Sequence, residues 1–237
     1  MFKKHLLSCY LLTKFNMKKI YKLIITTVLM TSLNTACVLA QSKKFSGPSI
    51  SVGGSAIGSR VGVDFTDAST NNTGLSFDLG KTDFTLSGEA SYTMPLKSNF
   101  AFEIGVNGDL NNEIDAGRIS LSGITLKYTY GSHYSAYIKP IYLINDSSGV
   151  FIRVGAHEAK AKLTAYEGAT SGSEEQKIKG TGYGAGVKSF INNNLFIQAE
   201  VNAVDYEKIS ETISSTNTVV SHTPRTVSGT VMLGYQF

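Results

Sequence analysis

The chain has 237 residues, with 22 Lys and Arg against 18 Asp and Glu, and a formal net charge of +4. Residues 1–40 hold six Lys and no acidic residue, so the other 197 residues carry 16 basic and 18 acidic side chains and a net charge of −2. This balance gives no argument for nucleic-acid binding. Both cysteines, Cys9 and Cys37, lie within residues 1–40, which excludes a disulfide or a cysteine metal site from the rest of the chain.

Residues 1–40 are predicted to be a signal peptide. A basic start after Met17 precedes an apolar run of about a dozen residues, which is too short to span a membrane comfortably, and a small-residue exit that predicts cleavage after Ala40. Met17 is an alternative start of the chain. Cys37 leaves a second possibility open, since bacterial lipoproteins acylate a cysteine that follows a short apolar box. Residues 41–237 are expected to form one domain.

The domain has alternating apolar and polar residues in several runs and no convincing capped helix. The clearest runs are "FTLSGEASYTM" (84–94), "FAFEIGVNGDL" (100–110), "LFIQAEVNA" (195–203) and the C-terminal "VSGTVMLGYQF" (227–237). This period of two is typical of a strand with two different faces. Each run is about the length, nine to eleven residues, that a tilted strand needs to cross a bilayer.

The segments between the runs alternate between short and long. Short turns are expected at 95–99, 145–149 and 192–194, and long polar loops at 66–82, 111–132, 165–177 and 208–224. The eight strands are then expected near 49–64, 83–95, 100–110, 133–144, 150–163, 178–191, 195–207 and 225–237. Segment 118–131 also alternates, and it is either part of the second long loop or a strand that continues beyond the membrane. Pro140 lacks an N–H group, so a local bulge is expected there.

Two all-β folds fit this pattern, and a transmembrane antiparallel up-and-down barrel of eight strands is favoured over a soluble sandwich or lipocalin-like barrel. Aromatic residues gather near the expected strand ends, as in the interfacial girdles of membrane barrels: Phe84, Tyr92, Phe100, Phe102, Tyr142, Phe190, Phe196, Tyr206, Tyr235 and Phe237. The rows opposite the apolar ones carry charges in mid-strand: Glu89, Glu103, Lys139, Arg153, Lys188 and Glu200. Three acids and three bases are expected to face a narrow lumen and to plug it with ion pairs. The alternative is that several of them sit near wet rims.

The chain resembles the eight-stranded OmpA-like or porin-like outer-membrane barrels of Gram-negative bacteria over about 45–237. The resemblance is carried by "YSAYIKPIYLIND" (134–146), "GVFIRVGAHEAK" (149–160), "GTGYGAGVKSFINNNLFIQAEVNAVDY" (180–206) and the terminal "GTVMLGYQF". It implies a monomer in the outer membrane, in contact with membrane lipids and lipopolysaccharide. Thr230, Tyr235 and Phe237 match part of the C-terminal signal that the barrel-assembly machinery reads in this family.

The sequence carries little sign of catalysis. His133 and Ser135 faintly resemble the His-x-Ser of outer-membrane lipid A deacylases, but Ala136 and Ser147 stand where that pattern wants Asn and an acid. We therefore expect no enzyme, no metal and no cofactor, with a lipid-modifying enzyme as a remote alternative. The expected role is structural or one of surface interaction through the long loops, and a narrow porin for small solutes is the second candidate.

Overall fold

The structure is a computed structural model, and it describes residues 44–67, 73–97, 99–110, 113–121, 124–168, 170–213 and 218–237. The predicted signal peptide, the alternative start at Met17, the cleavage after Ala40 and the question of Cys37 lie outside the described residues. The described residues belong to one compact unit, Leu39–Phe237. Among them, no helix is both long enough and apolar enough to cross a membrane.

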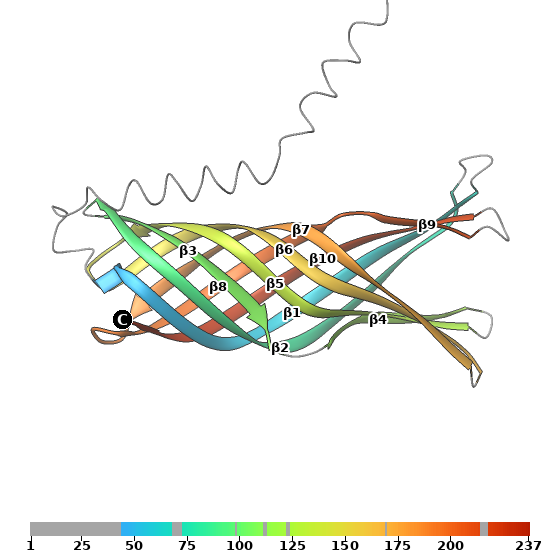
Figure 1. Cartoon of the computed structure of the whole chain (residues 1–237), viewed down its shortest axis with the longest axis horizontal. Helices are drawn as coiled ribbons and strands as arrows, with labels where there is room; N and C mark the ends of the chain where they lie inside the picture. Colours follow the sequence, from blue (N-terminus) through green and yellow to red (C-terminus); the bar gives the residue numbers. More distant parts are fainter. Residues whose placement is uncertain are drawn as a thin grey trace, which may run out of the picture. The chain divides into compact units, whose positions relative to one another are not determined.

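The described part of the chain forms ten strands, all antiparallel to their neighbours (Figure 1). They are β1 (Gly47–Asp67), β2 (Thr73–Lys97), β3 (Phe100–Asp109), β4 (Glu113–Leu121), β5 (Ile124–Leu143), β6 (Ser148–Glu167), β7 (Thr170–Phe190), β8 (Leu195–Tyr206), β9 (Ile209–Ile213) and β10 (Thr218–Gln236). Eight of them close a ring in the order β1-β2-β3-β5-β6-β7-β8-β10, because β10 pairs back onto β1. The predicted eight-stranded all-β barrel is confirmed.

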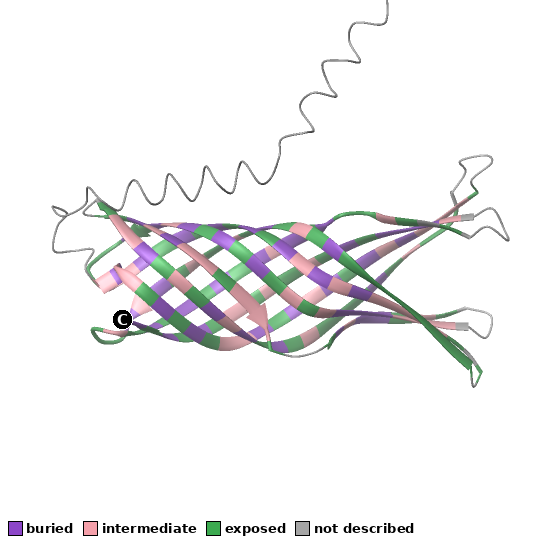
Figure 2. Ribbon diagram, in the orientation of Figure 1, coloured by how far each residue is buried: buried purple, intermediate pink, exposed green. Residues whose placement is uncertain are grey.

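The two faces of each strand differ sharply, and Figure 2 shows the alternation around the wall. The outward rows are exposed and apolar: Ile50, Val52, Phe84, Leu86, Tyr92, Val106, Ile138, Ile152, Val154, Val187, Ile197, Val201, Val231, Leu233 and Tyr235. The inward rows at the same level are polar, for example Thr85, Ser87 and Glu89 on β2. This arrangement is the reverse of a soluble barrel or sandwich and matches a lipid-facing wall.

We call the ring of outward apolar side chains the belt. At one end, the turn end, it reaches the three short connections and the C-terminus. At the other end it stops at outward-facing charged residues: Arg60, Asp78, Glu158, Lys179, Asp205 and Arg225. The strands continue past these charges and separate into two lobes, one of β1 and β2 with β9 and β10, the other of β4 to β7 (Figure 1). We call this the lobe end.

The predicted long loops are wrong for most of their residues. Strands run into 66–82, 165–177 and 208–224, and segment 111–132 contains β4 and the start of β5. Of the two interpretations of 118–131, the strand that continues beyond the membrane is therefore right. These segments are rich in Ser and Thr, which resembles loop composition, but 66–82, 111–132 and 208–224 contribute residues to one buried apolar cluster, such as Leu79, Ile114 and Val220.

The expected bulge at Pro140 is also wrong. Pro140 faces Phe102 in the β3–β5 ladder with no shift of register, and β5 keeps one register with β6 on both sides of it. The irregularity of β5 lies between Gly131 and Tyr134, where Ser132 has a φ of 49°. An unpaired extra residue in that left-handed conformation is what a bulge requires.

The aromatic girdle holds for some of the predicted members only. Phe84, Tyr92, Phe100, Tyr142, Tyr235 and Phe237 are exposed on the outer face. Phe190, Phe196 and Tyr206 are buried inside the barrel. Phe190 lies on the row of Lys188, and Phe196 and Tyr206 lie on the row of Glu200. These rows face the lumen as predicted, so only the girdle assignment of the three aromatic residues is wrong. Because side chains alternate between the two faces of a strand, a shift of one position decides whether an aromatic residue at a strand end joins the outer girdle or fills the lumen.

Candidate functional site: the filled lumen

The lumen is filled in three layers, and the first closes the turn end. Phe45, Ala101, Ile141, Leu143, Phe151, Phe190 and Phe196 form one buried apolar cluster. Phe45 lies just before β1 and is completely buried, with its ring 4.9 Å from that of Phe190 at 77°. We call this set the turn-end cluster. It seals the barrel with an edge-to-face packing that aromatic rings favour.

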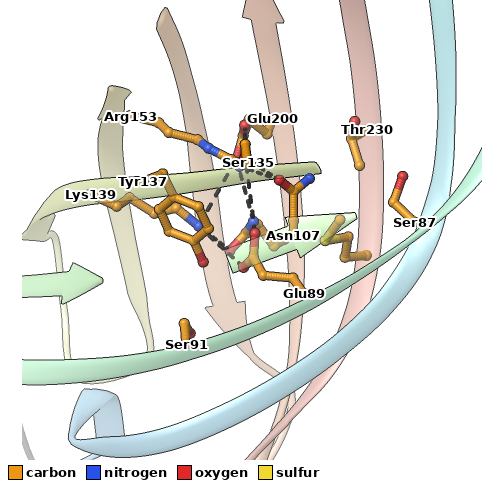
Figure 3. Close-up of polar contacts among 12 residues, drawn as sticks. Ser87, Glu89, Ser91, Asn107, Ser135, Tyr137, Lys139, Arg153, Glu200 and Thr230 are labelled. Atoms are coloured by element: carbon orange, nitrogen blue, oxygen red, sulfur yellow. Dashed lines mark hydrogen bonds and ion pairs between the residues drawn. The ribbon is translucent and has the colours of Figure 1, made fainter. Parts of the chain in front are cut away.

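The second layer is the ion-pair network at the level of the belt (Figure 3). The structure places all six predicted charged residues in the lumen, each no more than 7% exposed. Lys139 Nζ lies 2.9 Å from Glu103 Oε1, 3.3 Å from Glu89 Oε1 and 4.0 Å from Glu200 Oε2. The strand register places Lys139 directly opposite Glu103, which accounts for the closest of these contacts.

Two further cations complete the network. Arg153 Nη1 lies 2.9 Å from Glu200 Oε1 and 3.6 Å from Glu89 Oε2, and Lys188 Nζ lies 3.0 Å from Glu103 Oε2. Three carboxylates therefore share three cations, so the buried formal charge of these six residues is zero. A buried charge is tolerated when it is both paired and hydrogen-bonded.

Polar and aromatic neighbours hold the charged groups in place. Glu103 accepts hydrogen bonds from Thr93 Oγ1 at 3.0 Å and from Tyr137 OH at 3.2 Å. The Arg153 guanidinium carbon lies 4.0 Å from the centre of the Tyr137 ring, and Lys188 Nζ lies 4.0 Å from that of Phe196. Cation–π contacts of this kind gain strength where water is excluded. The Phe196 contact also joins the network to the turn-end cluster.

A hydrogen-bonded chain of Asp109, His133 and His157 lies on the lobe-end side of the network. His133 Nδ1 is 3.0 Å from Asp109 Oδ2, and His133 Nε2 is 2.9 Å from His157 Nδ1. Beside it is a cavity of about 30 Å³, lined in part by Asn107, Asp109, Arg153 and Asn202. Such a volume holds roughly two waters. Waters there would reach the orphaned Asn202 Oδ1 and Arg153 Nε.

These extra members of the site were not singled out from the sequence. Asn107, Asp109, Tyr137 and Gln198 lie on the same inward rows as the predicted charges, at spacings of two residues. Row membership alone could have predicted them as luminal. The pairing of His133 with His157 depends on the register between β5 and β6, which no spacing reveals.

The remote lipid-modifying alternative required His133 to activate Ser135. Instead, Ser135 Oγ donates to Asn107 Oδ1 and accepts from Arg153 Nη2 at 3.0 Å, while both ring nitrogens of His133 are engaged with Asp109 and His157. The two side chains are not hydrogen-bonded to each other. Within the described ranges, no group of three or more His, Cys, Asp or Glu could hold a metal ion.

The third layer lies beyond the belt and fills the space between the lobes. We call it the lobe-end cluster: Ile57, Val61, Val63, Leu79, Ile114, Ala116, Tyr128, Tyr130, Ala159, Ala161, Ile178, Val204, Tyr206 and Val220. Tyr130 stacks on Tyr206 with ring centres 5.9 Å apart. The larger of the two apolar clusters therefore lies beyond the belt, where an ordinary hydrophobic effect operates.

Side chains join the two lobes at β2 and β4, which share no backbone ladder among the described strands. Lys81 Nζ lies 2.7 Å from Asp115 Oδ2, and the Asp115 N–H donates to Asp83 Oδ2 at 2.9 Å. Burial alone would raise the pKa of Asp115, but hydrogen bonds from Lys81 and from the Gly117 N–H outweigh it and lower that pKa. Backbone N–H groups of Asp115 and Phe84 lower the pKa of Asp83. We call this contact the β2–β4 seam.

The predicted assembly-signal residues lie in β10 and just after it. Tyr235 and Phe237 are exposed on the outer face with ring centres 5.0 Å apart. Thr230 points the other way, and its hydroxyl lies 2.7 Å from Ser55 Oγ inside the barrel. The Phe237 N–H donates to the Pro48 carbonyl at 2.9 Å, which ties the last residue to β1. Their role in assembly stays a prediction.

Comparison with known proteins agrees with this architecture. The model of the outer membrane protein beta-barrel domain matches residues 26–237. The chain belongs to this family. Membership places the barrel in an outer membrane. No curated protein sequence matches the chain.

Solved structures of other members of this architecture are similar to the chain in fold. Ail of Yersinia pestis is 19% identical over 81% of this chain and 99% of its own, with a TM-score of 0.44. The outer membrane protease OmpT from Escherichia coli is 9% identical over 81% of this chain and 97% of its own, with a TM-score of 0.53. Neisserial surface protein A is 15% identical over 81% and 98%, with a TM-score of 0.36. At 9% identity, the likeness to OmpT shows the fold alone.

Proposed function

We propose that this chain is a surface-interaction barrel that contacts partners through its two lobes while its lumen stays closed to solutes. The turn end then faces the periplasm and the lobes face the exterior. The barrel acts as a monomer without enzymatic activity, its belt contacts membrane lipids and lipopolysaccharide, and the barrel-assembly machinery inserts it.

The observation that carries this proposal is the length of the strands beyond the belt. β6 has 20 residues and β7 has 21, about twice the nine to eleven that cross a bilayer. Every described side chain from Ser171 to Lys177 is exposed on both faces of β7. A rigid sheet that projects this far presents a fixed surface, which favours recognition of a partner.

The narrow-porin alternative needs a continuous water path through the barrel. Ion pairs occupy the lumen at the level of the belt, and aromatic rings occupy it at the turn end. An eight-stranded barrel has an interior just wide enough to be filled by its own side chains. The filled lumen therefore supports the surface role over transport.

Binding by intact cells tests the proposal. Cells that display the full protein should adhere to immobilised extracellular-matrix proteins or surface glycans. A variant with residues 165–171 replaced by a two-residue turn should keep the heat-modifiable gel shift of a folded barrel and lose adhesion. A control with Val201→Leu in the belt should adhere normally. Equal adhesion by the shortened variant would count against a role for this lobe.

A further inference from the structure

A cleft between the two lobes has no role in the closed lumen. Tyr128 of β5, Leu163 of β6 and Glu174 and Gln176 of β7 line it from one lobe, and Ile209 of β9 and His222 of β10 line it from the other. The cleft holds a cavity of about 30 Å³. A volume of this size holds roughly two waters, since one water needs roughly 10–15 Å³.

Two buried polar atoms of the residues that line the cleft lack partners. Tyr128 and His222 are 2% and 6% exposed, and neither the Tyr128 hydroxyl nor His222 Nδ1 has a hydrogen-bond partner in the described part of the chain. Their ring centres are 6.1 Å apart. Leaving a buried polar group unpaired is costly, so two such groups in residues that line one cavity indicate a missing partner. His222 falls within the predicted loop 208–224 and is instead a buried residue of β10.

The charge of the lining residues and their hydrogen-bond acceptors define the missing partner. Glu174 is the one charged residue among the lining residues, and within the described ranges it forms no ion pair, whereas its neighbour Glu175 pairs with Lys160 at 2.9 Å. Burial lowers the pKa of His222, so its ring is neutral and one ring nitrogen accepts a hydrogen bond. The Tyr128 oxygen and the Gln176 carbonyl also accept. The cleft thus offers acceptors, an aromatic face and a negative charge.

We infer that this cleft binds a primary ammonium group, either of a lysine side chain or of a small alkyl amine. An ammonium carries three donors and no acceptor, which complements Tyr128, His222 and Glu174. It is compact enough for the cavity, whereas a planar guanidinium is larger. Its aliphatic stem packs against Leu163 and Ile209, and its charge gains from the Tyr128 ring. The site does not depend on what the lobes bind elsewhere.

Titration of the refolded barrel, residues 41–237, in lipid nanodiscs tests this inference. The probes are n-propylammonium with 1-propanol as its neutral counterpart, and Nα-acetyl-lysine methylamide with its Nε-acetylated form. Binding is followed by the NMR shifts of the His222 ring. Saturable binding of either amine, and weaker binding of its neutral counterpart, is expected. Binding of both amines assigns the site to ammonium groups in general, and binding of the lysine compound alone assigns it to a peptide partner.

Matched variants separate the site from general effects on folding. Tyr128→Phe keeps the ring and removes a hydroxyl that has no partner, so the barrel should stay folded while amine binding weakens roughly tenfold. Tyr130→Phe is its control, because that hydroxyl is also buried and unpartnered but does not line the cleft. Glu174→Gln should weaken binding and Glu175→Gln should not. Equal binding of 1-propanol, equal loss in both tyrosine variants or no saturable binding would overturn the inference.

Discussion

At the residue scale, the barrel depends on a balance of six buried charges. Lys139 contacts three carboxylates, more than either of the other two cations, so its removal should disturb the network most. Lys139→Met should lower the free energy of unfolding by about 3–5 kcal/mol, because it leaves one carboxylate buried without a cation. Urea denaturation in lipid vesicles measures this loss.

A second substitution tests whether charge balance is the cause. Glu89→Gln added to Lys139→Met leaves Glu103 with Lys188 and Glu200 with Arg153 as two matched pairs. The double variant should therefore recover a large part of the lost stability. If it is less stable than Lys139→Met alone, packing of the lysine stem and not its charge explains the effect.

Inward-facing glycines make room for the luminal rings. A Cβ on Gly182 would lie 2.2 Å from His157 Nε2, and one on Gly234 would lie 2.1 Å from Phe196 Cζ. Gly182→Ala should destabilise the barrel by about 1–3 kcal/mol through overpacking, as seen in the temperature of the heat-modifiable gel transition. Gly229→Ala is the matched control, since nothing lies within 4 Å of its Cβ position. Equal transitions for the two variants would contradict this role.

At the element scale, the β2–β4 seam joins the lobes through titratable groups. The folded pKa values of Asp83 and Asp115 lie below their ordinary values, so the stability they contribute is present above about pH 4 and is lost as pH falls through the lowered values. The protection factor of the Asp115 amide, which is its exchange rate compared with the intrinsic rate at the same pH, should therefore fall below about pH 4. Asp83→Asn should lower this protection factor at pH 7 and flatten its dependence on pH. An unchanged protection factor from pH 7 to pH 3 would contradict the prediction.

The end of β10 is the element that closes the ring. Phe237, just after β10, donates its N–H to the Pro48 carbonyl of β1, and its exposed ring lies at the turn-end edge of the belt. Phe237→Asp should slow insertion and raise degradation in the periplasm, because the terminal strand is the edge that the assembly machinery would pair with. Tyr166→Asp, at an exposed aromatic residue of a lobe, should leave the level of folded barrel unchanged. Normal amounts of Phe237→Asp barrel would contradict the assembly role.

Period-two alternation predicted the membrane layer of each strand well, because one wrong residue of register would expose charges such as Glu103 to lipid. The lobes were missed, because outside the bilayer nothing forces a strand to be apolar on its outer face. The sequence also did not predict which luminal charges form ion pairs with each other. Lys139 meets Glu103 through a neighbouring strand, but Lys188 reaches the same carboxylate across the lumen.

At the scale of the whole barrel, three layers with different chemistry close one tube. The turn-end cluster excludes water, the ion-pair network satisfies the polar inner rows within the belt, and the lobe-end cluster packs beyond it. Ladders between neighbouring strands close the ring over most of the belt, as a bilayer requires, and on β2 the ladder to β3 begins at Ser87. Rigidity at this level suits a scaffold that holds two projecting lobes.

Single-channel recording of the refolded mature chain in a planar bilayer tests the central claim, that the lumen is filled. A porin reconstituted in the same way supplies the positive control, and heat-modifiable migration confirms that the inserted barrel is folded. The filled lumen predicts a flat current, without resolved opening steps, at moderate applied voltage. Stable conductance steps from folded barrel would contradict it and would favour the narrow porin.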